Sequence, residues 1–319
     1  MQSSATLLIS LICLLVGVGF SGCRGANVKE SETKKAVLVR SEASETAGSK
    51  KKNSNLSSES TGFSKEELVN RCRVRLAELP GAGSQKDIDK ICGEVQILPR
   101  CKSVKGEPIF HYNKSAEREH PERILTFALV HGDELPSGTV ALNWMRRLME
   151  ISPRNEWRVV PVLNPDGMAK NTRMNANGID INRNFPSKDW EELAVHYWKS
   201  RTHSDPRRFP GNTGGSEPET QCAMDHLADF RPDLVIAVHT PYGVLDFDGP
   251  RLPFPKFKGL PWVSLGTYPG SLGRYMWTDQ NRPVLTIELK QDLKATLDRF
   301  DQLQDISGQV ALQIRQLKE

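Results

Sequence analysis

Three short hydrophobic runs in this chain each lead directly into a residue that can bind a metal or transfer a proton. Runs of about four to eight apolar residues bounded by polar turns predict buried strands. In open α/β sheets, ligands gather at the carboxyl ends of such strands. We therefore expect the three residues to lie together in space. The runs are residues 124–130 before His131, residues 235–238 before His239, and residues 283–287 before Glu288.

Segments with helical periodicity alternate with these runs. Residues 136–151 place Trp144 and Leu148 on one side, as the buried face of a helix does. A further strand is predicted at 157–163, and helices at 189–199, 219–230 and 291–317. The alternation predicts an α/β fold over residues 106–319, with a mixed, mostly parallel central sheet and helices on both faces.

The segments between these elements are predicted as turns and loops. Residues 164–167, Asn-Pro-Asp-Gly, carry a strong turn signal. Residues 168–187 lack periodicity and are dense in Asn and Arg, and the stretch between His239 and residue 283 is an Asp- and Gly-rich loop.

Residues 63–105 are expected to form a small Cys-containing segment ahead of the main domain. The sequence from Ser64 to Glu67 is typical of a capped helix start, and Leu68 and Leu76 follow at helical spacing. A Pro- and Gly-rich turn ends that helix, and a second short element begins after it. The pattern does not indicate a function for this segment.

Residues 1–22 are predicted as an export signal. Residues 7–20 are apolar, too few for a comfortable membrane span but typical of a signal-peptide core. The end of this segment resembles the bacterial lipoprotein cleavage box, which would make Cys23 the lipidated first residue. Phe20 and the uncharged start of the chain depart from that pattern, so a cleaved soluble signal and a retained anchor stay open. Each alternative places the rest of the chain outside the cytoplasm, and we expect it at the periplasmic face of a bacterial membrane or soluble in the periplasm.

Residues 23–62 are predicted to be a disordered tether. They are rich in Ser, Glu, Lys, Thr and Asn and poor in large apolar side chains. Such a composition buries too little surface to offset the entropy of ordering. A tether of about forty residues would hold a domain roughly 35 Å from a membrane.

Composition and charge exclude some classes of function. The formal charge of +4 over 319 residues is too small to indicate a nucleic-acid partner, and basic residues do not alternate with aromatic ones as in RNA-binding surfaces. We therefore expect no nucleic acid, and we expect a monomer.

Four of the six cysteines remain after the signal segment and Cys23 are set aside. In an oxidising compartment some of them pair. The first three are close in sequence, so at least one bridge among them is expected, while the full connectivity stays open. No Cys-x-x-Cys spacing occurs, which disfavours a cysteine zinc site. The four are Cys72, Cys92, Cys101 and Cys222.

The spacing of His131 and Glu134 is suited to metal binding. In a helical turn, residues three apart lie on one face, so an imidazole and a carboxylate can meet one ion. A lone histidine after a strand is more often a hydrogen-bonded loop residue. His239 supplies a third candidate ligand, and zinc accepts this mixture of nitrogen and oxygen donors. The sequence predicts one Zn²⁺ per chain, although the same residues bind other divalent ions.

Five motifs occur in the order and approximate spacing of the zinc metallocarboxypeptidases, over about residues 106–290. Within that family the chain resembles the bacterial murein peptide amidase branch, which trims cell-wall peptides. Segments 172–175, 214–220, 245–250 and 268–273 carry the resemblance to this branch. The family motifs are residues 131–134 (His-Gly-Asp-Glu), 164–167, 178–185, His239 and Glu288.

The resemblance implies roles for individual residues. His131, Glu134 and His239 match the zinc ligands, and Glu288 matches the general base and acid. Arg173 is the nearest candidate for the arginine that stabilises the oxyanion. Larger relatives carry that arginine in a Trp-Arg-Lys context, which this sequence lacks.

Further residues match the family's substrate-binding positions. Asn182 and Arg183 match the pair that holds the terminal carboxylate of the substrate, and Tyr268 matches the tyrosine that closes over it. If the terminal residue is meso-diaminopimelate, Arg274 is expected to meet its second carboxylate. Asp246 or Asp248 would then meet its ammonium group. These three charges are otherwise solvated loop residues, and a lysine-type or ordinary protein terminus stays open.

The resemblance implies a zinc-dependent exopeptidase that hydrolyses the γ-D-glutamyl–meso-diaminopimelate bond of peptidoglycan-derived peptides, held at a membrane through Cys23. Two alternatives belong to other classes. A zinc N-acyl amino acid deacylase would also need Arg183. A non-catalytic lipoprotein that binds peptidoglycan peptides would have no need of Glu288, so the complete residue set argues against it.

Overall fold

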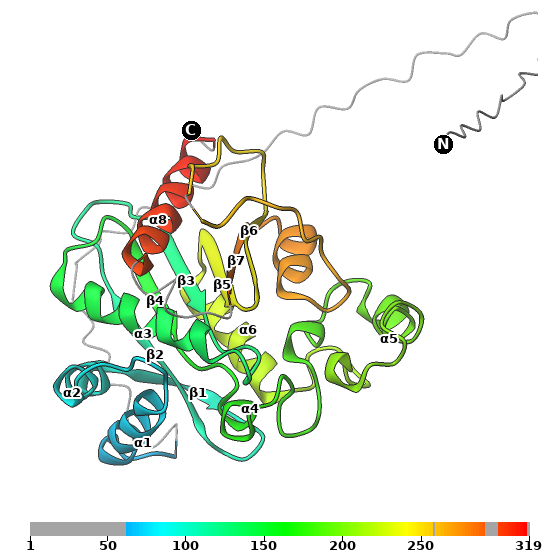
Figure 1. The fold of residues 1–319 in the computed structure, drawn as a ribbon, viewed down its shortest axis with the longest axis horizontal. Coiled ribbons are helices and arrows are strands. Elements are labelled where there is room, and N and C mark those ends of the chain that lie inside the picture. Colours follow the sequence, from blue (N-terminus) through cyan, green and yellow to red (C-terminus); the bar gives the residue numbers. More distant parts are fainter. Residues whose placement is uncertain (1–61, 258, 291–298, 318–319) are drawn as a thin grey trace, which may run out of the picture. The chain divides into compact units, whose positions relative to one another are not determined.

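The computed structural model describes residues 62–257, 259–290 and 299–317, which belong to one compact unit (Figure 1). The predicted export signal, Cys23 and the tether up to residue 61 lie outside the described residues. So does the beginning of the predicted last helix, residues 291–298. Within the described part of the chain, no helix combines the length and apolar character that crossing a membrane requires.

One mixed sheet of seven strands forms the centre of this unit, in the order β1-β2-β4-β3-β5-β7-β6. The central strands β4, β3, β5 and β7 are parallel, whereas the outer pairs β1–β2, β2–β4 and β6–β7 are antiparallel. The strands are β1 (Gln96–Lys102), β2 (Pro108–Lys114), β3 (Arg123–Phe127), β4 (Glu156–Val160), β5 (Leu234–His239), β6 (Tyr242–Asp248) and β7 (Val284–Lys290).

Helices cover both faces of the sheet, which confirms the predicted fold class. Trp157 of β4 packs against Trp144 of α3, while Phe127 of β3 packs against His226 of α6. Trp157 and Phe127 lie on opposite faces because Trp157 pairs with Ile124, three residues before Phe127. Figure 1 shows α3 and α8 together in front of the sheet. The helices are α1 (Lys65–Ala77), α2 (Gln85–Glu94), α3 (Leu135–Glu150), α4 (Pro165–Lys170), α5 (Trp190–Arg201), α6 (Pro218–Phe230) and α8 (Phe300–Gln316), with short turns η2 (Ile181–Arg183), η3 (Pro206–Arg208) and η4 (Arg274–Thr278).

The parallel strands are apolar because helices bury both of their faces. Every residue of β5 is buried, which explains why residues 234–238 form a continuous apolar run. Burying an aliphatic side chain such as Leu125 or Val238 contributes about 1.5–3 kcal/mol. The strands therefore form a rigid support for the polar residues that follow them.

The segment at 63–105 packs into the same unit as the residues after it. Its strand β1 pairs with β2 at the edge of the sheet. A disulfide between Cys72 and Cys92 joins α1 to α2, which confirms the expected bridge within the cysteine cluster. A second disulfide joins Cys101 of β1 to Cys222 of α6. The boundary expected at residue 105 therefore falls between two paired strands.

Two expectations about loops were wrong. The turn predicted at 164–167 is the start of helix α4, because the Asn164 side chain accepts a hydrogen bond from the Gly167 amide at 2.8 Å and caps the helix. The Asp- and Gly-rich stretch after His239 contains strand β6. Its acidic residues face a cavity rather than the core, so the apolar signal of a strand is missing.

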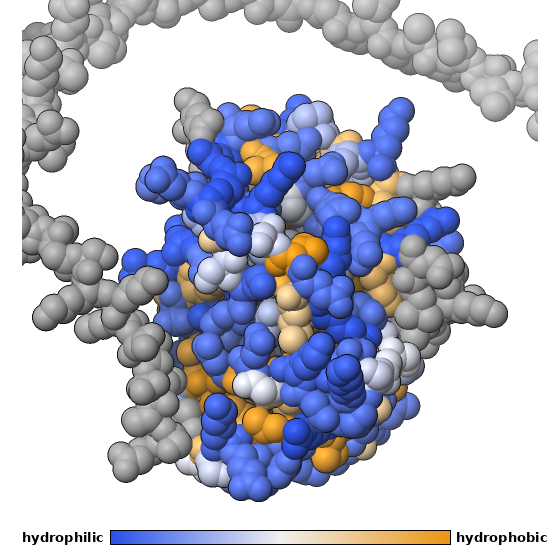
Figure 2. All heavy atoms as spheres, turned by 90° about the vertical axis from the view of Figure 1, so that its left-hand side faces the viewer, coloured by the Kyte–Doolittle hydropathy of each residue, from blue (hydrophilic) through white to orange (hydrophobic). Residues whose placement is uncertain are grey.

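The surface of the unit is largely polar on the face that Figure 2 shows, with hydrophobic side chains scattered between charged ones. Scattered single hydrophobic residues are normal for a folded surface. This face gives no indication of an apolar docking site.

Candidate active site

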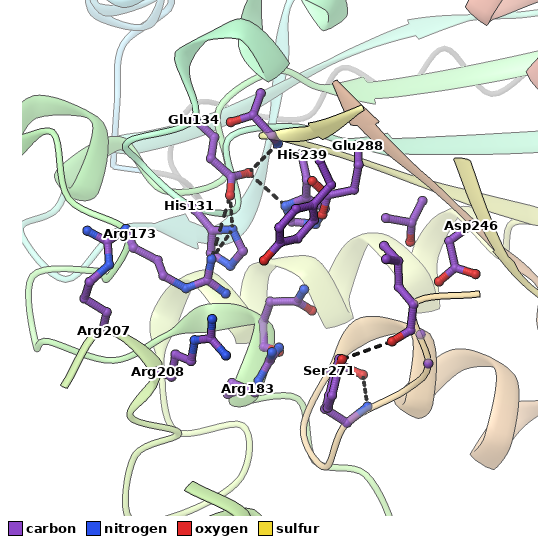
Figure 3. Close-up of a pocket in the computed structure, with 18 of the residues that line it drawn as sticks. His131, Glu134, Arg173, Arg183, Arg207, Arg208, His239, Asp246, Ser271 and Glu288 are labelled. Carbon is purple, nitrogen blue, oxygen red and sulfur yellow. Dashed lines mark hydrogen bonds and ion pairs between the residues drawn. The ribbon is translucent and has the colours of Figure 1, made fainter. Parts of the chain in front are cut away.

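Three candidate metal ligands converge after neighbouring strands β3 and β5 (Figure 3). Nδ1 of His131 lies 2.7 Å from one carboxylate oxygen of Glu134, and Nδ1 of His239 lies 2.9 Å from the other. All three side chains are buried, and one ligand atom from each lies within 4.8 Å of the others. The loop that bears His131 closes when the Glu134 amide donates to the His131 carbonyl, so the motif is a turn before α3.

The cluster fits zinc by the chemistry of its donors and by its support. Two imidazoles and one carboxylate are the ligand types of catalytic zinc sites. Nε2 of His131 lies 3.2 Å from Asp180, which is fully buried. A carboxylate behind a ligand histidine orients the ring and fixes its tautomer, so that the other nitrogen can face a metal. The residues present therefore fit the metal that the sequence predicts.

The electrostatics of the cluster favour ionised carboxylates. Burial would raise the pKa of Glu134, but the two histidines outweigh it and hold that pKa well below its usual range. Burial would likewise raise the pKa of Asp180, and Arg173 and His131 outweigh it in the same way. Both groups are thus ready to stabilise positive charge at neutral pH.

Arg173 reaches the same cluster. Its guanidinium holds Asp180 through Nε at 2.9 Å and Nη2 at 2.8 Å. Its Nη1 lies 3.2 Å from Nδ1 of His131 and 3.8 Å from Glu134. The structure therefore places Arg173 where a cation can meet negative charge that develops beside the cluster.

Glu288 lies beside the ligands on strand β7. It is the register partner of His239 on β5 and is 8% exposed. One of its carboxylate oxygens has no hydrogen-bond partner among the described residues. Burial raises the pKa of Glu288 and the charge of Glu134 adds to this, while His239 opposes it. A buried carboxylate with a raised pKa and a free oxygen is suited to taking up and returning a proton.

Asn182, Arg183 and Tyr268 line the same cavity. The Asn182 side chain accepts a hydrogen bond from the Leu272 amide at 2.9 Å, and Arg183 donates to the Asn182 carbonyl at 2.7 Å. The guanidinium of Arg183 stacks on the Tyr268 ring at 4.8 Å, and its Nε has no partner among the described residues. The group is preorganised and has unused capacity to donate to an anion.

Asp246 and Asp248 also line the cavity, whereas Arg274 does not. The two aspartates alternate along β6 and pair with Thr286 and Val284 of β7, so they share a face with Glu288. Burial raises the pKa of Asp248 to about 7, and the charge of Asp246 adds to this. Arg274 forms an ion pair with Asp189, so the structure does not bring it to the other predicted site residues.

Apart from Arg274, the predicted metal, catalytic and substrate-binding residues meet in one cavity of about 470 Å³. A close backbone contact supports it: a Cβ atom on Gly132 would lie 2.0 Å from the Gly167 carbonyl carbon. The first two family motifs therefore touch through their glycines, and only glycine permits this approach.

Asp180, which lies behind His131, and two arginines that line the cavity have no role assigned from the sequence. Asp180 lies within the family motif at residues 178–185, two residues before Asn182, and this position could have indicated a role in the site. Arg207 and Arg208 lie in the short turn η3, and only the fold brings them to the cavity. No local pattern indicates such residues, because their role depends on where a long loop returns.

A second group of metal-type residues consists of Cys101, Cys222 and His226. The two sulfurs are joined in the disulfide, and zinc binding requires thiolates. This group therefore supports the fold and does not compete as the metal site.

Comparison with known families places the site in context. Residues 95–246 match the family described as zinc carboxypeptidase. Murein peptide amidase A of Vibrio campbellii is 32% identical over 196 residues, which cover 59% of this chain and 77% of the relative. Murein peptide amidase A of Escherichia coli K12 is 35% identical over 147 residues, 46% of this chain. The chain spans 59% of the length of that relative.

Solved structures share the fold. The murein-tripeptide amidase MpaA from Escherichia coli O157 superposes with a TM-score of 0.50 at 23% identity, over 75% of this chain and 95% of that chain. Thrombin-activatable fibrinolysis inhibitor superposes with a TM-score of 0.58 at 15% identity, over 78% of this chain and 80% of that chain. At these identities the likeness concerns the fold alone.

Proposed function

The chain belongs to the zinc carboxypeptidase family, and on this premise we propose that it is a zinc-dependent exopeptidase. It would hydrolyse a peptide bond next to a free carboxylate. One observation carries the proposal: the ligand cluster, Glu288 and Arg183 line a single cavity.

His131, Glu134 and His239 would hold the zinc, which supplies a Lewis acid that polarises the scissile carbonyl and acidifies water. Glu288 would take a proton from the attacking water and return it to the leaving amine. Arg173 would stabilise the negative charge on the carbonyl oxygen, an effect worth about 3 kcal/mol per donor. Asp180 would keep Arg173 and His131 in position through the hydrogen bonds described above.

Arg183 would select substrates with a free chain end. Its planar guanidinium matches a carboxylate with two parallel hydrogen bonds, which a mid-chain amide cannot accept. The Asn182 side-chain amide would donate a further hydrogen bond to the carboxylate. Tyr268, whose ring stacks on the Arg183 guanidinium, would close over the bound terminal residue.

We propose that the substrate is a peptidoglycan-derived peptide and that the bond is γ-D-glutamyl–meso-diaminopimelate. The relatives named murein peptide amidase support the class of substrate. Asp246 and Asp248 support diaminopimelate as the terminal residue. Its distal ammonium group, placed between them, would neutralise two crowded carboxylates and lower the raised pKa of Asp248. Arg274 has no part in this proposal, since it pairs with Asp189.

We also propose export and lipid anchoring at Cys23. A Cys23→Ser variant would then move from the membrane fraction to the soluble fraction, and a variant that stays in the membrane fraction would exclude this anchor. We further propose that the chain acts as a monomer. Light scattering of the purified chain would show a single-chain mass, and a larger mass would contradict it.

The test uses the full chain and four compounds, with products identified by mass spectrometry. We expect release of diaminopimelate from L-Ala-γ-D-Glu-meso-diaminopimelate, and loss of that release when a chelator is added. Two variants should react at least 10-fold more slowly: the tripeptide amidated at the terminal carboxylate next to the scissile bond, which lacks the charge that Arg183 meets, and the 2-aminopimelate analogue, which lacks the distal ammonium that the aspartates meet. Cleavage of N-acetyl-diaminopimelate but not of the tripeptide would replace this proposal by the deacylase.

A further inference from the structure

One wall of the cavity carries positive charge that the proposed chemistry does not use. We call it the arginine wall and define it as Arg201, Arg207 and Arg208, which follow one another from the end of α5 to η3. Figure 3 shows Arg207 and Arg208 on the side of the ligand cluster away from Asp246. The terminal carboxylate already has Arg183 and Asn182, so the arginine wall is free to meet a second anionic group of the substrate.

The arginines of the wall differ in how far they are already paired. Arg207 is 2.7 Å from Asp133, in a direct ion pair. The nearest acidic partner of Arg208 is Asp205, at 3.7 Å, and the Arg208 side chain is 45% exposed. Arg208 therefore retains most of its hydrogen-bonding capacity.

Arg208 also faces the interior of the cavity. Figure 3 shows its guanidinium directed toward the space between Arg173 and Arg183. Burial lowers the pKa of Arg183 and the charge of Asp180 opposes this, while the nearby charges of Arg173 and Arg208 lower the pKa further. Three guanidinium groups near one another repel, and an anionic ligand would relieve that repulsion.

Resting on the proposed function, we propose that Arg208 binds the free α-carboxylate of the γ-linked glutamyl residue that precedes the scissile bond. With the terminal residue held between Arg183 and Asp246, the preceding residue lies on the opposite side of the ligand cluster, toward the arginine wall. Arg208 is then a specificity residue that contacts substrate.

The chemistry of the γ-linkage explains why such a contact selects the substrate. A γ-linked glutamate is joined through its side chain, so its α-carboxylate stays free and charged beside the scissile bond. In an α-linked peptide the α-carboxyl group is consumed in the scissile bond itself, and an α-amidated γ-glutamyl residue has a neutral carboxamide in place of the carboxylate. A guanidinium distinguishes these groups because charge-assisted hydrogen bonds are about twice as strong as neutral ones.

The experiment compares two substrates in three forms of the full chain. The substrates are L-Ala-γ-D-Glu-meso-diaminopimelate and its α-amidated form, L-Ala-γ-D-isoglutaminyl-meso-diaminopimelate. We expect the wild type to prefer the acid by about 10- to 100-fold in kcat/KM. Arg208→Gln should lower kcat/KM for the acid by that factor and leave the amide within about threefold, so that the preference disappears.

Arg207→Gln is the matched control. It also removes one guanidinium from the arginine wall, but that guanidinium is already ion-paired with Asp133. It should keep the preference for the acid. If Arg208→Gln lowered kcat/KM equally for both substrates, or if the wild type did not distinguish them, Arg208 would not bind the α-carboxylate. Either result would leave the proposed function standing. A wild type that cleaves neither peptide would refute the proposed function and this proposal with it.

Discussion

Glu288 is the residue on which the proposed proton transfers depend. Its buried oxygen without a partner lies next to His239 in the strand register, and it does not need to move to reach the cavity. Replacing it by Gln preserves shape and removes the proton acceptor. We expect Glu288→Gln to lower kcat by about 100- to 10,000-fold.

Metal content separates this role from damage to the ligand cluster. Zinc bound per chain, measured by mass spectrometry of metals, should be unchanged in Glu288→Gln. The exposed residue Glu150 at the end of α3 provides a control, and Glu150→Gln should keep full activity. Activity within threefold of the wild type in Glu288→Gln would show that another group transfers the proton.

Asp248 provides a test of the electrostatics through stability. Its pKa is raised by burial to about 7 in the folded chain, from an ordinary value of 3.8. Between these values the unfolded chain binds fewer protons than the folded chain, so stability falls as pH rises. Asp248→Asn cannot ionise and should escape this loss.

We therefore expect Asp248→Asn to match the wild type near pH 4 and to exceed its unfolding free energy at pH 8. The gain should be about 1–3 kcal/mol, after allowance for solvent screening. Urea denaturation at both pH values measures it. Asp301→Asn, at an exposed position on α8, should follow the wild type at both. If the unfolding free energies of Asp248→Asn and the wild type differed by the same amount at both pH values, Asp248 would not be the titrating group.

At the scale of elements, the contact between the His131 loop and helix α4 sets the geometry of the site. A side chain on Gly132 would meet the backbone of Gly167, which cannot move without shifting the helix. Gly132→Ala should therefore displace His131 and weaken zinc binding by about 10- to 100-fold. Competition with a fluorescent chelator gives the affinity.

Gly93 offers the matched control for that substitution. It lies in helix α2, and a Cβ there would meet no atom within 4 Å. Gly93→Ala should leave zinc affinity unchanged and add about 0.5–1 kcal/mol to stability through helix propensity. Equal zinc affinity in Gly132→Ala and the wild type would show that the glycine contact does not position the ligands.

The sequence predicted the buried elements better than the exposed ones. Strands β3, β5 and β7 are parallel and covered on both faces, so their residues form apolar runs that end near His131, His239 and Glu288. Strand β6 escaped prediction because Asp246 and Asp248 face the cavity. The sequence also could not indicate Arg208, since only the return of a long loop brings it to the site.

At the scale of the whole molecule, the parallel centre of the sheet makes the site possible. Neighbouring parallel strands β3 and β5 deliver two histidines to one edge, and β7 adds the acid in register. The antiparallel strand β6 then brings two aspartates to the same face. Segments from residue 131 to residue 288 thus meet in one cavity, which is the arrangement that membership in the zinc carboxypeptidase family implies.

The most direct test titrates zinc into the metal-free full chain and measures diaminopimelate released from L-Ala-γ-D-Glu-meso-diaminopimelate. We expect hydrolysis to rise linearly up to one zinc per chain and then to stay constant, and we expect Glu134→Gln to show no rise. Full hydrolysis by the metal-free chain, or no hydrolysis with one zinc bound, would contradict this expectation.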